Sequence, residues 1–334
     1  MINSVLILSP HQDDDLNIAG CLLDQLNAAN ISISVCFVTN GDYRGVQEQR
    51  AKEVHKVSAL FGYKSIFYLG YGDGGYNNAL ANAPDDDTVT TSPAGYSETH
   101  GVLDFNDFHF LLHGKHAEYT KANMRTDIRE LLLFVHADLI FCVDKDEHPD
   151  HKLVSNLFDD ALNDIIRTTD YRPLVLKKFA YLGTWFGPED YFIRPAKSTV
   201  CFSKGLKGTV TSSTPYEWSE RIRFAVTPEM YRLCFWKSLI FKAYRFYSSQ
   251  NGIKHFLRAV NSDAVYWFID TKNECKISKD FPIENTPFHL FNEPDQHNNH
   301  FCYLFNLLYK LYVTFIYRVE NKIKRIIKHN FGTY

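Results

Sequence analysis

The first half of the chain alternates short apolar runs with segments of helical periodicity. Residues 5–8, 31–38, 65–69 and 139–143 form continuous apolar or β-branched runs, which predicts strands buried on both faces. Helices are predicted around Ile18, Leu22, Leu23 and Leu26 and over residues 48–61, 129–135 and 152–162. Because each predicted strand is linked to a helix, the pattern indicates an α/β fold with a mostly parallel sheet and helices on both of its faces.

The pattern changes at two places. Residues 75–121 are first polar and turn-rich, then dense in aromatic residues and histidine, which favours the wall or lid of a site. After residue 172 the chain is more β-like, with a helical stretch between about residues 227 and 247. We expect one domain over residues 1–270, interrupted by the insertion at about 75–121. A C-terminal α+β extension is expected over residues 271–334.

Composition narrows the class of protein. Hydrophobic residues make up 45% of the 334 residues and charged residues 22%, an ordinary globular balance. The net charge of −3 gives no indication of a nucleic-acid partner. Seven cysteines without a C-x-x-C pair suggest neither a disulfide framework nor a thiolate zinc site. Those in apolar runs, such as Cys36 and Cys142, are expected to be buried. The N-terminus has no basic leader, so we expect a cytoplasmic protein.

Two polar clusters follow predicted strands. The sequence SPHQDDD at residues 9–15 comes directly after the first strand, and DEHPDH at residues 146–151 comes after the strand at 139–143. In a parallel sheet, ligand sites form beyond the carboxyl ends of the strands. Consecutive carboxylates repel one another unless a cation lies among them. Two histidines and a carboxylate drawn from two strand ends would give three ligands and one open position, as in catalytic zinc sites.

Each cluster also has a structural interpretation when it is considered alone. The three aspartates at 13–15 suit a helix N-terminus, where carboxylates satisfy free backbone N–H groups. His-Pro-Asp-His at 148–151 suits a surface turn. The two clusters together, each at a strand end of one sheet, favour a metal site.

The two motifs resemble those of the PIG-L/LmbE-like deacetylases, A-H-P-D-D-E and H-P-D-H. Weaker matches are VTNGDYRG, QEQRAKEV, LGYGDGG and AYRFYSSQ, so the resemblance covers residues 4–165 well and 240–270 loosely. It implies a Rossmann-like fold and a zinc-dependent N-acetylglucosaminyl-type deacetylase, a hydrolase acting on a linear amide. The sequence departs from the pattern at Gln12, where proline is usual, and at Asp15, where glutamate is usual.

The resemblance also assigns roles to individual residues. It implies that His11, Asp14 and His151 are the zinc ligands. Asp13 would be the general base for the attacking water. His148 would stabilise the oxyanion or protonate the leaving amine. Asp150 would orient a histidine of the site.

Two further residues are candidates for binding the substrate. Arg50 can hold a hydroxyl or anionic group, and an ion pair with Glu48 or Glu53 is the alternative. His109 lies in the insertion with two further histidines at 113 and 116, where substrate contact, a second metal and simple exposure are all open. The aromatic residues of the insertion suit stacking on a sugar or packing onto the core.

The chemistry is consistent with amide hydrolysis. Bound zinc lowers the pKa of its water to about 7, and a carboxylate within reach collects the proton. We therefore expect an N-acetylated amino sugar as the substrate, in a glycan, a glycolipid precursor or a nucleotide sugar. Another amide, a non-catalytic sugar-binding role and Fe²⁺ in place of Zn²⁺ remain alternatives. Calcium would not explain the histidines, because it prefers oxygen ligands.

The C-terminal end has a distinct composition. Residues 301–317 are strongly apolar and aromatic, and residues 318–330 are basic. The run is too short for a spanning helix, which needs about 20 apolar residues. A helix packed on the protein itself or on a partner is one interpretation, and peripheral contact of residues 301–329 with an anionic membrane is the other. The oligomeric state is left open.

Overall fold

The computed structural model describes most of the chain. The described residues are 1–146, 148–180, 185–186, 200–201, 209–211, 214–231, 238–252 and 262–292, with Leu311, Phe315, Val319 and Lys322. The structural statements that follow refer to these residues.

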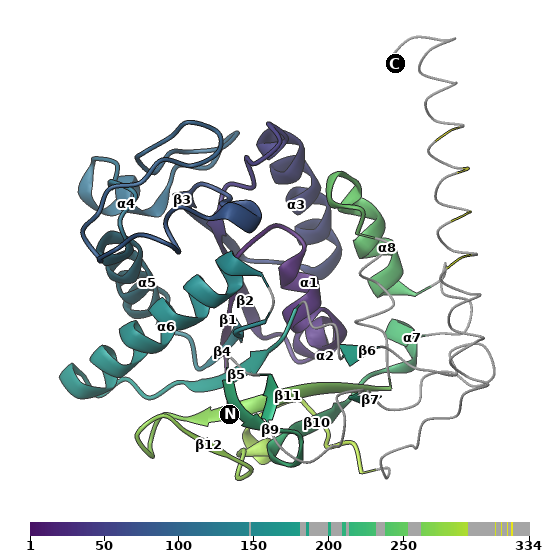
Figure 1. Cartoon of the computed structure of the whole chain (residues 1–334). Helices are drawn as coiled ribbons and strands as arrows, with labels where there is room; N and C mark the ends of the chain where they lie inside the picture. Colours follow the sequence, from purple (N-terminus) through teal and green to yellow (C-terminus); the bar gives the residue numbers. More distant parts are fainter. Residues whose placement is uncertain are drawn as a thin grey trace.

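One large mixed sheet forms the centre of the structure (Figure 1). Its strands lie in the order β10-β11-β5-β4-β1-β2-β3, and β12 pairs with β11. The parallel strands are β1 (Ser4–Ser9), β2 (Ser32–Thr39), β3 (Ser65–Tyr71), β4 (Leu139–Val143) and β5 (Leu174–Lys178). The antiparallel strands are β10 (Ile222–Ala225), β11 (Asp263–Asp270) and β12 (Lys276–Ser278). The predicted α/β fold with a mostly parallel sheet is confirmed.

Helices connect the parallel strands and lie on both sides of the sheet (Figure 1). They are α1 (Asp14–Ala19), η1 (Gly20–Leu22), α2 (Leu23–Ala28), α3 (Gln47–Phe61), α5 (Lys121–Val135) and α6 (Pro149–Thr168). The helix predicted after the first strand is thus divided into three pieces. The first division falls at Gly20. Ile240 packs closely there, and a Cβ added to the glycine would lie 2.6 Å from Cδ1 of Ile240.

The remaining elements are short. In the second half they are β6 (Trp185–Phe186) with β7 (Val200–Cys201), β8 (Thr209–Thr211) with β9 (Thr214–Glu217), η3 (Trp218–Glu220), α7 (Pro228–Tyr231), α8 (Leu239–Phe246), η5 (Ser248–Gln250) and η6 (Ile283–Asn285). In the insertion they are η2 (Gly75–Asn77) and α4 (Phe108–His113). Phe108 and Tyr119 of the insertion are buried, so its aromatic residues contribute to the core.

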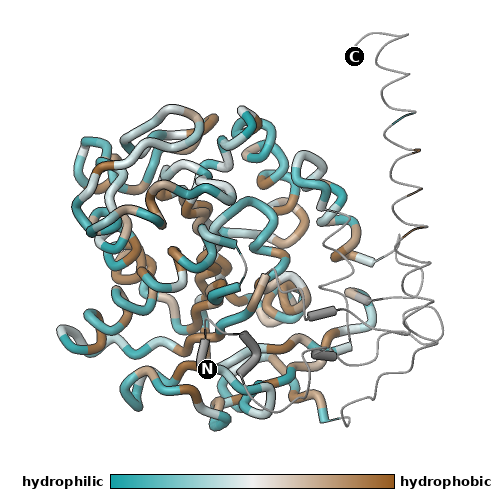
Figure 2. The backbone as a smooth tube through the Cα atoms, in the orientation of Figure 1, coloured by the Kyte–Doolittle hydropathy of each residue, from teal (hydrophilic) through white to brown (hydrophobic). Residues whose placement is uncertain are grey.

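The core lies along the parallel strands. Figure 2 shows that hydrophobic residues are concentrated in the centre of the molecule. Every residue of β4 is buried, as are residues 5–9 of β1. Cys36 and Cys142 are buried and free, as predicted from their apolar surroundings. Strands covered on both faces leave polar side chains only at their ends, and this places the chemistry at the rim of the sheet.

The described parts of the C-terminal end are few. Most of residues 301–329 lie outside the described residues, so their contact with a membrane surface stays a prediction. Leu311, Phe315 and Val319 are helical and exposed, four residues apart. Within the described part of the chain, no helix combines the length and the apolar character needed to cross a bilayer. The cytoplasmic location and the division into a domain and an extension also stay predictions.

A buried ion cluster fastens α6 to the sheet. Lys177 of β5 is fully buried, and its Nζ donates to Asp159 Oδ1 at 2.5 Å and to Ser155 Oγ at 2.9 Å, both on α6. It lies 3.9 Å from Asp144 Oδ1 at the end of β4. Burial alone would lower the pKa of Lys177, but the two carboxylates together raise it. The lysine therefore stays charged and holds α6, with its N-terminal motif, over the end of β4.

We predict that Lys177→Met lowers the free energy of unfolding by about 3–5 kcal/mol, because it leaves the buried Asp144 carboxylate without the nearby charge of Lys177. Urea denaturation measures the change. The control is Lys276→Met, since that side chain is 62% exposed where it pairs with Glu274. The control should stay within about 0.5 kcal/mol of the wild type. A loss below about 1 kcal/mol in Lys177→Met would show that the cluster does not hold the helix.

Candidate metal centre

The first motif forms the turn between β1 and α1. His11, Asp13 and Asp14 are all buried. The Ser9 hydroxyl donates to the His11 carbonyl at 2.7 Å, which tightens the turn. Asp13, directly before α1, has φ 150° and ψ −19°, a conformation that non-glycine residues rarely adopt. Strained backbone of this kind is concentrated at functional sites.

The second motif forms the turn between β4 and α6. His148 is the N-cap of α6, and its Nδ1 accepts a hydrogen bond from the Asp150 backbone N–H at 3.2 Å. Pro149 occupies the first turn, where its missing N–H costs nothing. His151 is one turn along the helix and is fully buried. The parallel pairing of β1 with β4 brings the two motifs together.

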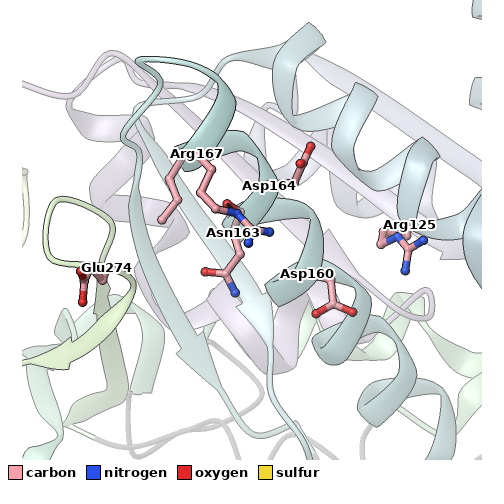
Figure 3. A pocket seen from close by; sticks show the side chains of 7 residues that line it. Arg125, Asp160, Asn163, Asp164, Arg167 and Glu274 are labelled. Atoms are coloured by element: carbon pink, nitrogen blue, oxygen red, sulfur yellow. Dashed lines mark hydrogen bonds between the residues drawn. The ribbon is translucent and has the colours of Figure 1, made fainter.

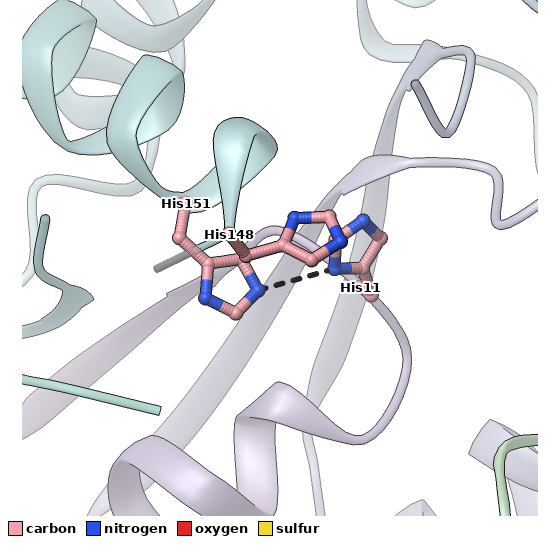
Figure 4. Close-up of side chains that lie close together, drawn as sticks. All are labelled: His11, His148 and His151. Atoms are coloured by element: carbon pink, nitrogen blue, oxygen red, sulfur yellow. Dashed lines mark hydrogen bonds between the residues drawn. The ribbon is translucent and has the colours of Figure 1, made fainter. Parts of the chain in front are cut away.

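Three side-chain atoms from the two motifs form a small triangle. Asp14 Oδ2 lies 3.1 Å from His11 Nδ1 and 3.0 Å from His151 Nε2. The two histidine atoms are 3.3 Å apart, and Figure 4 shows this contact as a dashed line. Ligands bonded to tetrahedral zinc at about 2.0–2.1 Å lie about 3.3–3.5 Å from one another. The three atoms of the predicted ligand set are therefore slightly closer together than the ligands of a bound zinc ion, and a small outward shift would give the zinc spacing.

Each histidine of the triangle contacts a further carboxylate through its other ring nitrogen. Asp150 Oδ2 lies 3.1 Å from His11 Nε2, and Asp146 Oδ2 lies 2.8 Å from His151 Nδ1. Carboxylates in this position fix the tautomer and orientation of metal-binding histidines. Asp150 thus contacts His11, and its role in orienting that ring stays a prediction. Asp146 was given no role from the sequence, because its spacing from His151 is typical of no motif.

The third histidine lies beside the triangle. The His148 ring centroid is 4.9 Å from that of His11 and 4.8 Å from that of His151 (Figure 4). His11, His148 and His151 each offer a ring nitrogen within 4.8 Å of the others. The pKa of His148 is lowered to about 3 because burial and the two neighbouring histidines disfavour its cation. The His148 side chain is therefore neutral near pH 7.

The buried acids of the first motif differ in their protonation. Burial and the charge of Asp14 raise the pKa of Asp13, and Arg50 opposes this only in part. Burial would also raise the pKa of Asp14, but His151 and His11 hold it well below its usual value. One carboxylate is thus a firm anion, suited to a ligand, and its neighbour is a stronger base.

Arg50 contacts the loop that follows β3. Its Nη1 lies 3.1 Å from Asp73 Oδ2, and Asp73 Oδ1 lies 3.6 Å from His11 Nε2. Among the described residues Arg50 pairs with Asp73, whereas Glu53, one of its two alternative partners, accepts hydrogen bonds from Ser248 and Ser249. Asp73 was also given no role from the sequence. His11, Asp73 and Asp150 form a second group whose ligand atoms lie within 4.8 Å of one another.

His109 lies elsewhere in the described structure. It is on α4, and its Nδ1 lies 2.6 Å from Asp127 Oδ1 on α5. Its ring contacts His113 at 4.4 Å, and His113 pairs with Glu130 at 2.8 Å. None of these described contacts is with the triangle, and contact of His109 with a substrate stays a prediction.

The two residues that depart from the family pattern have structural contacts. Gln12 Nε2 donates to the Thr39 carbonyl at 2.8 Å, which ties the first motif to the end of β2. Asp15 accepts from the Tyr63 and Tyr247 hydroxyls at 2.8 and 3.0 Å. Burial raises the pKa of Asp15 to about 7, although these hydrogen bonds oppose it. Both positions serve packing around the triangle.

A polar pocket of about 750 Å³ lies away from the two motifs (Figure 3). Its lining residues are Arg125, Asp160, Asn163, Asp164, Ile166, Arg167 and Glu274. Arg125 is already paired with Asp86 at 2.7 Å. Because no predicted site residue lines this pocket, it does not change the assignment of the centre.

Comparisons with known proteins identify the domain. Residues 6–162 match the family model PIG-L, GlcNAc-PI de-N-acetylase. No curated protein sequence matches the chain.

Solved structures give weaker similarity. For N,N'-diacetylchitobiose deacetylase from Pyrococcus horikoshii, the identity is 16%, the TM-score 0.37 and the coverage 55% of this chain and 62% of that one. This chain thus spans less than two thirds of that protein. For a conserved protein from Thermus thermophilus, the identity is 21%, the TM-score 0.34 and the coverage 53% of this chain and 67% of that one. For a deacetylase of teicoplanin biosynthesis, the identity is 17%, the TM-score 0.45 and the coverage 83% of this chain and 100% of that one.

Both metal motifs lie within the matched range, and the match confirms the resemblance on which the expectation of a deacetylase rested. Residues 6–162 of this chain are a domain of the PIG-L family, the GlcNAc-PI de-N-acetylase family.

Proposed function

We propose that this protein is a metal-dependent N-deacetylase that hydrolyses the acetamido group of an amino sugar. The observation that carries the proposal is the triangle of His11 Nδ1, Asp14 Oδ2 and His151 Nε2, with separations of 3.0–3.3 Å. The family match over residues 6–162 supports the reaction class. Zinc is the proposed ion, because two imidazoles and one carboxylate with an open position are typical of catalytic zinc.

The side chains around the triangle fit such an ion. Asp150 and Asp146 accept from the outer nitrogens of His11 and His151, which turns the other nitrogen of each ring toward the triangle. Asn17 donates to Asp14 Oδ1 at 3.0 Å and leaves Oδ2 as the atom facing both histidines. When bound, zinc would act as a Lewis acid and supply hydroxide near neutral pH.

Asp13 is the proposed general base. It precedes the proposed ligand Asp14, and its raised pKa strengthens it as a proton acceptor. The positive charges of Arg50 and His11 oppose this rise. We infer that Asp13 takes the proton of the attacking water and passes it on to the leaving amine.

His148 is proposed to stabilise the oxyanion. Its Nδ1 accepts from the Asp150 backbone N–H, so in the neutral ring the proton is on Nε2. With its pKa lowered to about 3, this histidine is a hydrogen-bond donor at neutral pH and a poor source of a proton. Of its two predicted roles, oxyanion stabilisation is therefore favoured over protonation of the amine.

Arg50 and Asp73 are proposed to bind the sugar. Their ion pair lies next to His11 and offers a cation and a carboxylate to hydroxyl groups. Both are largely buried, with 11% and 8% of their side chains exposed, so a ligand would meet groups already fixed in place. This placement supports Arg50 as a substrate residue.

The first experiment is acetate release from a panel of N-acetylated monosaccharides, nucleotide sugars and lipid-linked sugars. We expect release that stops with a chelator and returns with zinc, because the base and the oxyanion donor need the bound ion. Restoration by Fe²⁺ and not by zinc would identify iron as the metal. No release from any substrate, with one metal ion bound per chain, would contradict the proposal and favour another amide or a binding role.

We predict that Asp13→Asn lowers kcat by about 10²–10⁴-fold, because the amide cannot accept the proton. Metal content measured by elemental analysis should stay at the wild-type level, since Asp13 is not a proposed ligand. Asp85→Asn, which changes an exposed carboxylate, is the control and should keep full activity. Wild-type turnover in Asp13→Asn would assign the base elsewhere.

We predict that Asp146→Asn weakens zinc binding by about 10–100-fold, because it removes the carboxylate that orients His151. Competition with a chelating dye gives the affinity. The matched control is Asp104→Asn, which removes the carboxylate from another histidine pair, 3.1 Å from His55 on the exposed surface. Equal zinc affinity in all three proteins would show that Asp146 does not support zinc binding through His151.

A further inference from the structure

Two exposed tyrosines lie at the rim of the candidate metal centre. Tyr76, in η2, is 81% exposed, and Tyr43, between β2 and α3, is 46% exposed. Single exposed aromatic residues are common on protein surfaces. These two are notable for their position, because both belong to the strand-end loops that build the centre.

Tyr76 contacts the centre directly, and Tyr43 is next in sequence to a residue that contacts it. The Tyr76 ring centroid is 5.4 Å from that of His148, the proposed oxyanion donor. Tyr43 follows Asp42, whose Oδ1 accepts the Asp73 N–H at 2.7 Å, and Asp73 is paired with Arg50. Both tyrosines are thus more exposed than Arg50 and Asp73, the groups proposed to hold the reacting sugar.

Gly75 lets the Tyr43 ring pack against the turn that carries Tyr76. An ideal Cβ on Gly75 would lie 2.7 Å from Cε2 of Tyr43, so the Tyr43 ring rests against this backbone. Gly75 also has φ 55°, a left-handed conformation that favours glycine. Because Tyr76 is the next residue, the two rings flank one short turn. A side chain at position 75 would separate the Tyr43 ring from it.

The other exposed aromatic residues within residues 1–146 are differently placed. Tyr96 is stacked on His100 at 3.8 Å, and Phe110 is stacked on His116 at 5.0 Å. Phe134 contacts Phe67 and Phe108 in edge-to-face geometry. Exposed apolar area beside a polar buried site is typical of ligand binding. Tyr76 combines such exposure with contact to His148, and Tyr43 packs on the turn that carries Tyr76.

We propose that Tyr43 and Tyr76 form an aromatic rim that stacks on the sugar unit adjoining the one that carries the acetamido group. The inference rests on the proposed function and adds a substrate class, saccharides of at least two units. The triangle and His148 are the groups proposed for the reacting unit, and Tyr43 and Tyr76 are far more exposed than these. Flat aromatic faces suit the apolar face of a pyranose and leave its hydroxyls in water.

The test compares N-acetylglucosamine with its β1,4-linked dimer and trimer. We expect Tyr76→Ala and Tyr43→Ala each to raise KM for the dimer and trimer by about 3–10-fold, the strength of one aromatic contact. Values of kcat, and KM for the monomer, should stay within about twofold of the wild type. Tyr76→Phe and Tyr43→Phe should behave as wild type, since the ring is retained.

Phe134→Ala is the control, because it removes an aromatic ring that is 61% exposed and contacts none of the rim. Metal content reports whether each variant keeps an intact centre. An equal rise in KM for monomer and dimer, or no rise for either, would overturn the rim. A variant that loses its metal is replaced by the leucine substitution at the same position, which keeps apolar bulk without a ring and should raise KM for the dimer.

Failure of the proposed function gives a different result. If the wild type releases no acetate from any of the three saccharides, saturation-transfer NMR still measures their binding. The rim predicts binding of the dimer and trimer by the wild type that is weakened in both alanine variants and kept in Phe134→Ala. No binding of any saccharide to the metal-loaded wild type would overturn the rim as well.

Discussion

The parallel pairing of β1 with β4 is the constraint on which the centre depends. Val5 lies opposite Leu139 and Leu8 opposite Cys142, so both strands end at the same edge of the sheet. One turn carries His11 and Asp14, and the other carries His151. A shift of two residues in this register would move one motif by about 7 Å along the sheet, more than twice the separation within the triangle. Continuous burial of both strands makes such a shift costly, because it would expose apolar side chains or bury polar ones.

The centre gathers more negative charge than a folded protein normally buries. Six of its carboxylates are buried, namely Asp13, Asp14, Asp15, Asp73, Asp146 and Asp150. Arg50 and the histidines offset part of this charge, and tyrosine and backbone donors offset more. The raised pKa values of Asp13 and Asp150 show that the compensation is incomplete without a cation. A divalent ion within the triangle would remove this imbalance, which gives the proposed metal a role in stability as well as in catalysis.

Elements distant in the sequence support the centre. Glu53 of α3 accepts from Ser248 and Ser249, and Asp15 accepts from Tyr247. Tyr244 of α8 donates to Asn17 at 2.8 Å, and Asn17 donates to Asp14. Residues 244–249 thus make hydrogen bonds that support the first motif, although they lie outside residues 6–162, which match the family model. The residues that make these contacts belong to the segment AYRFYSSQ.

The sequence by itself determined the strands β1 to β4, the helices that follow them and the positions of the two polar motifs, because these depend on local periodicity and on the spacing within each motif. It also led to the resemblance that the family match confirms. Only the tertiary structure decided that Asp146 orients His151, that Arg50 pairs with Asp73 rather than with Glu53, and that Lys177 fastens α6. Each of these contacts joins side chains from different loops, helices or strands, or from opposite ends of one turn. Their partners are chosen by the geometry of the sheet edge, which no local pattern of residues records.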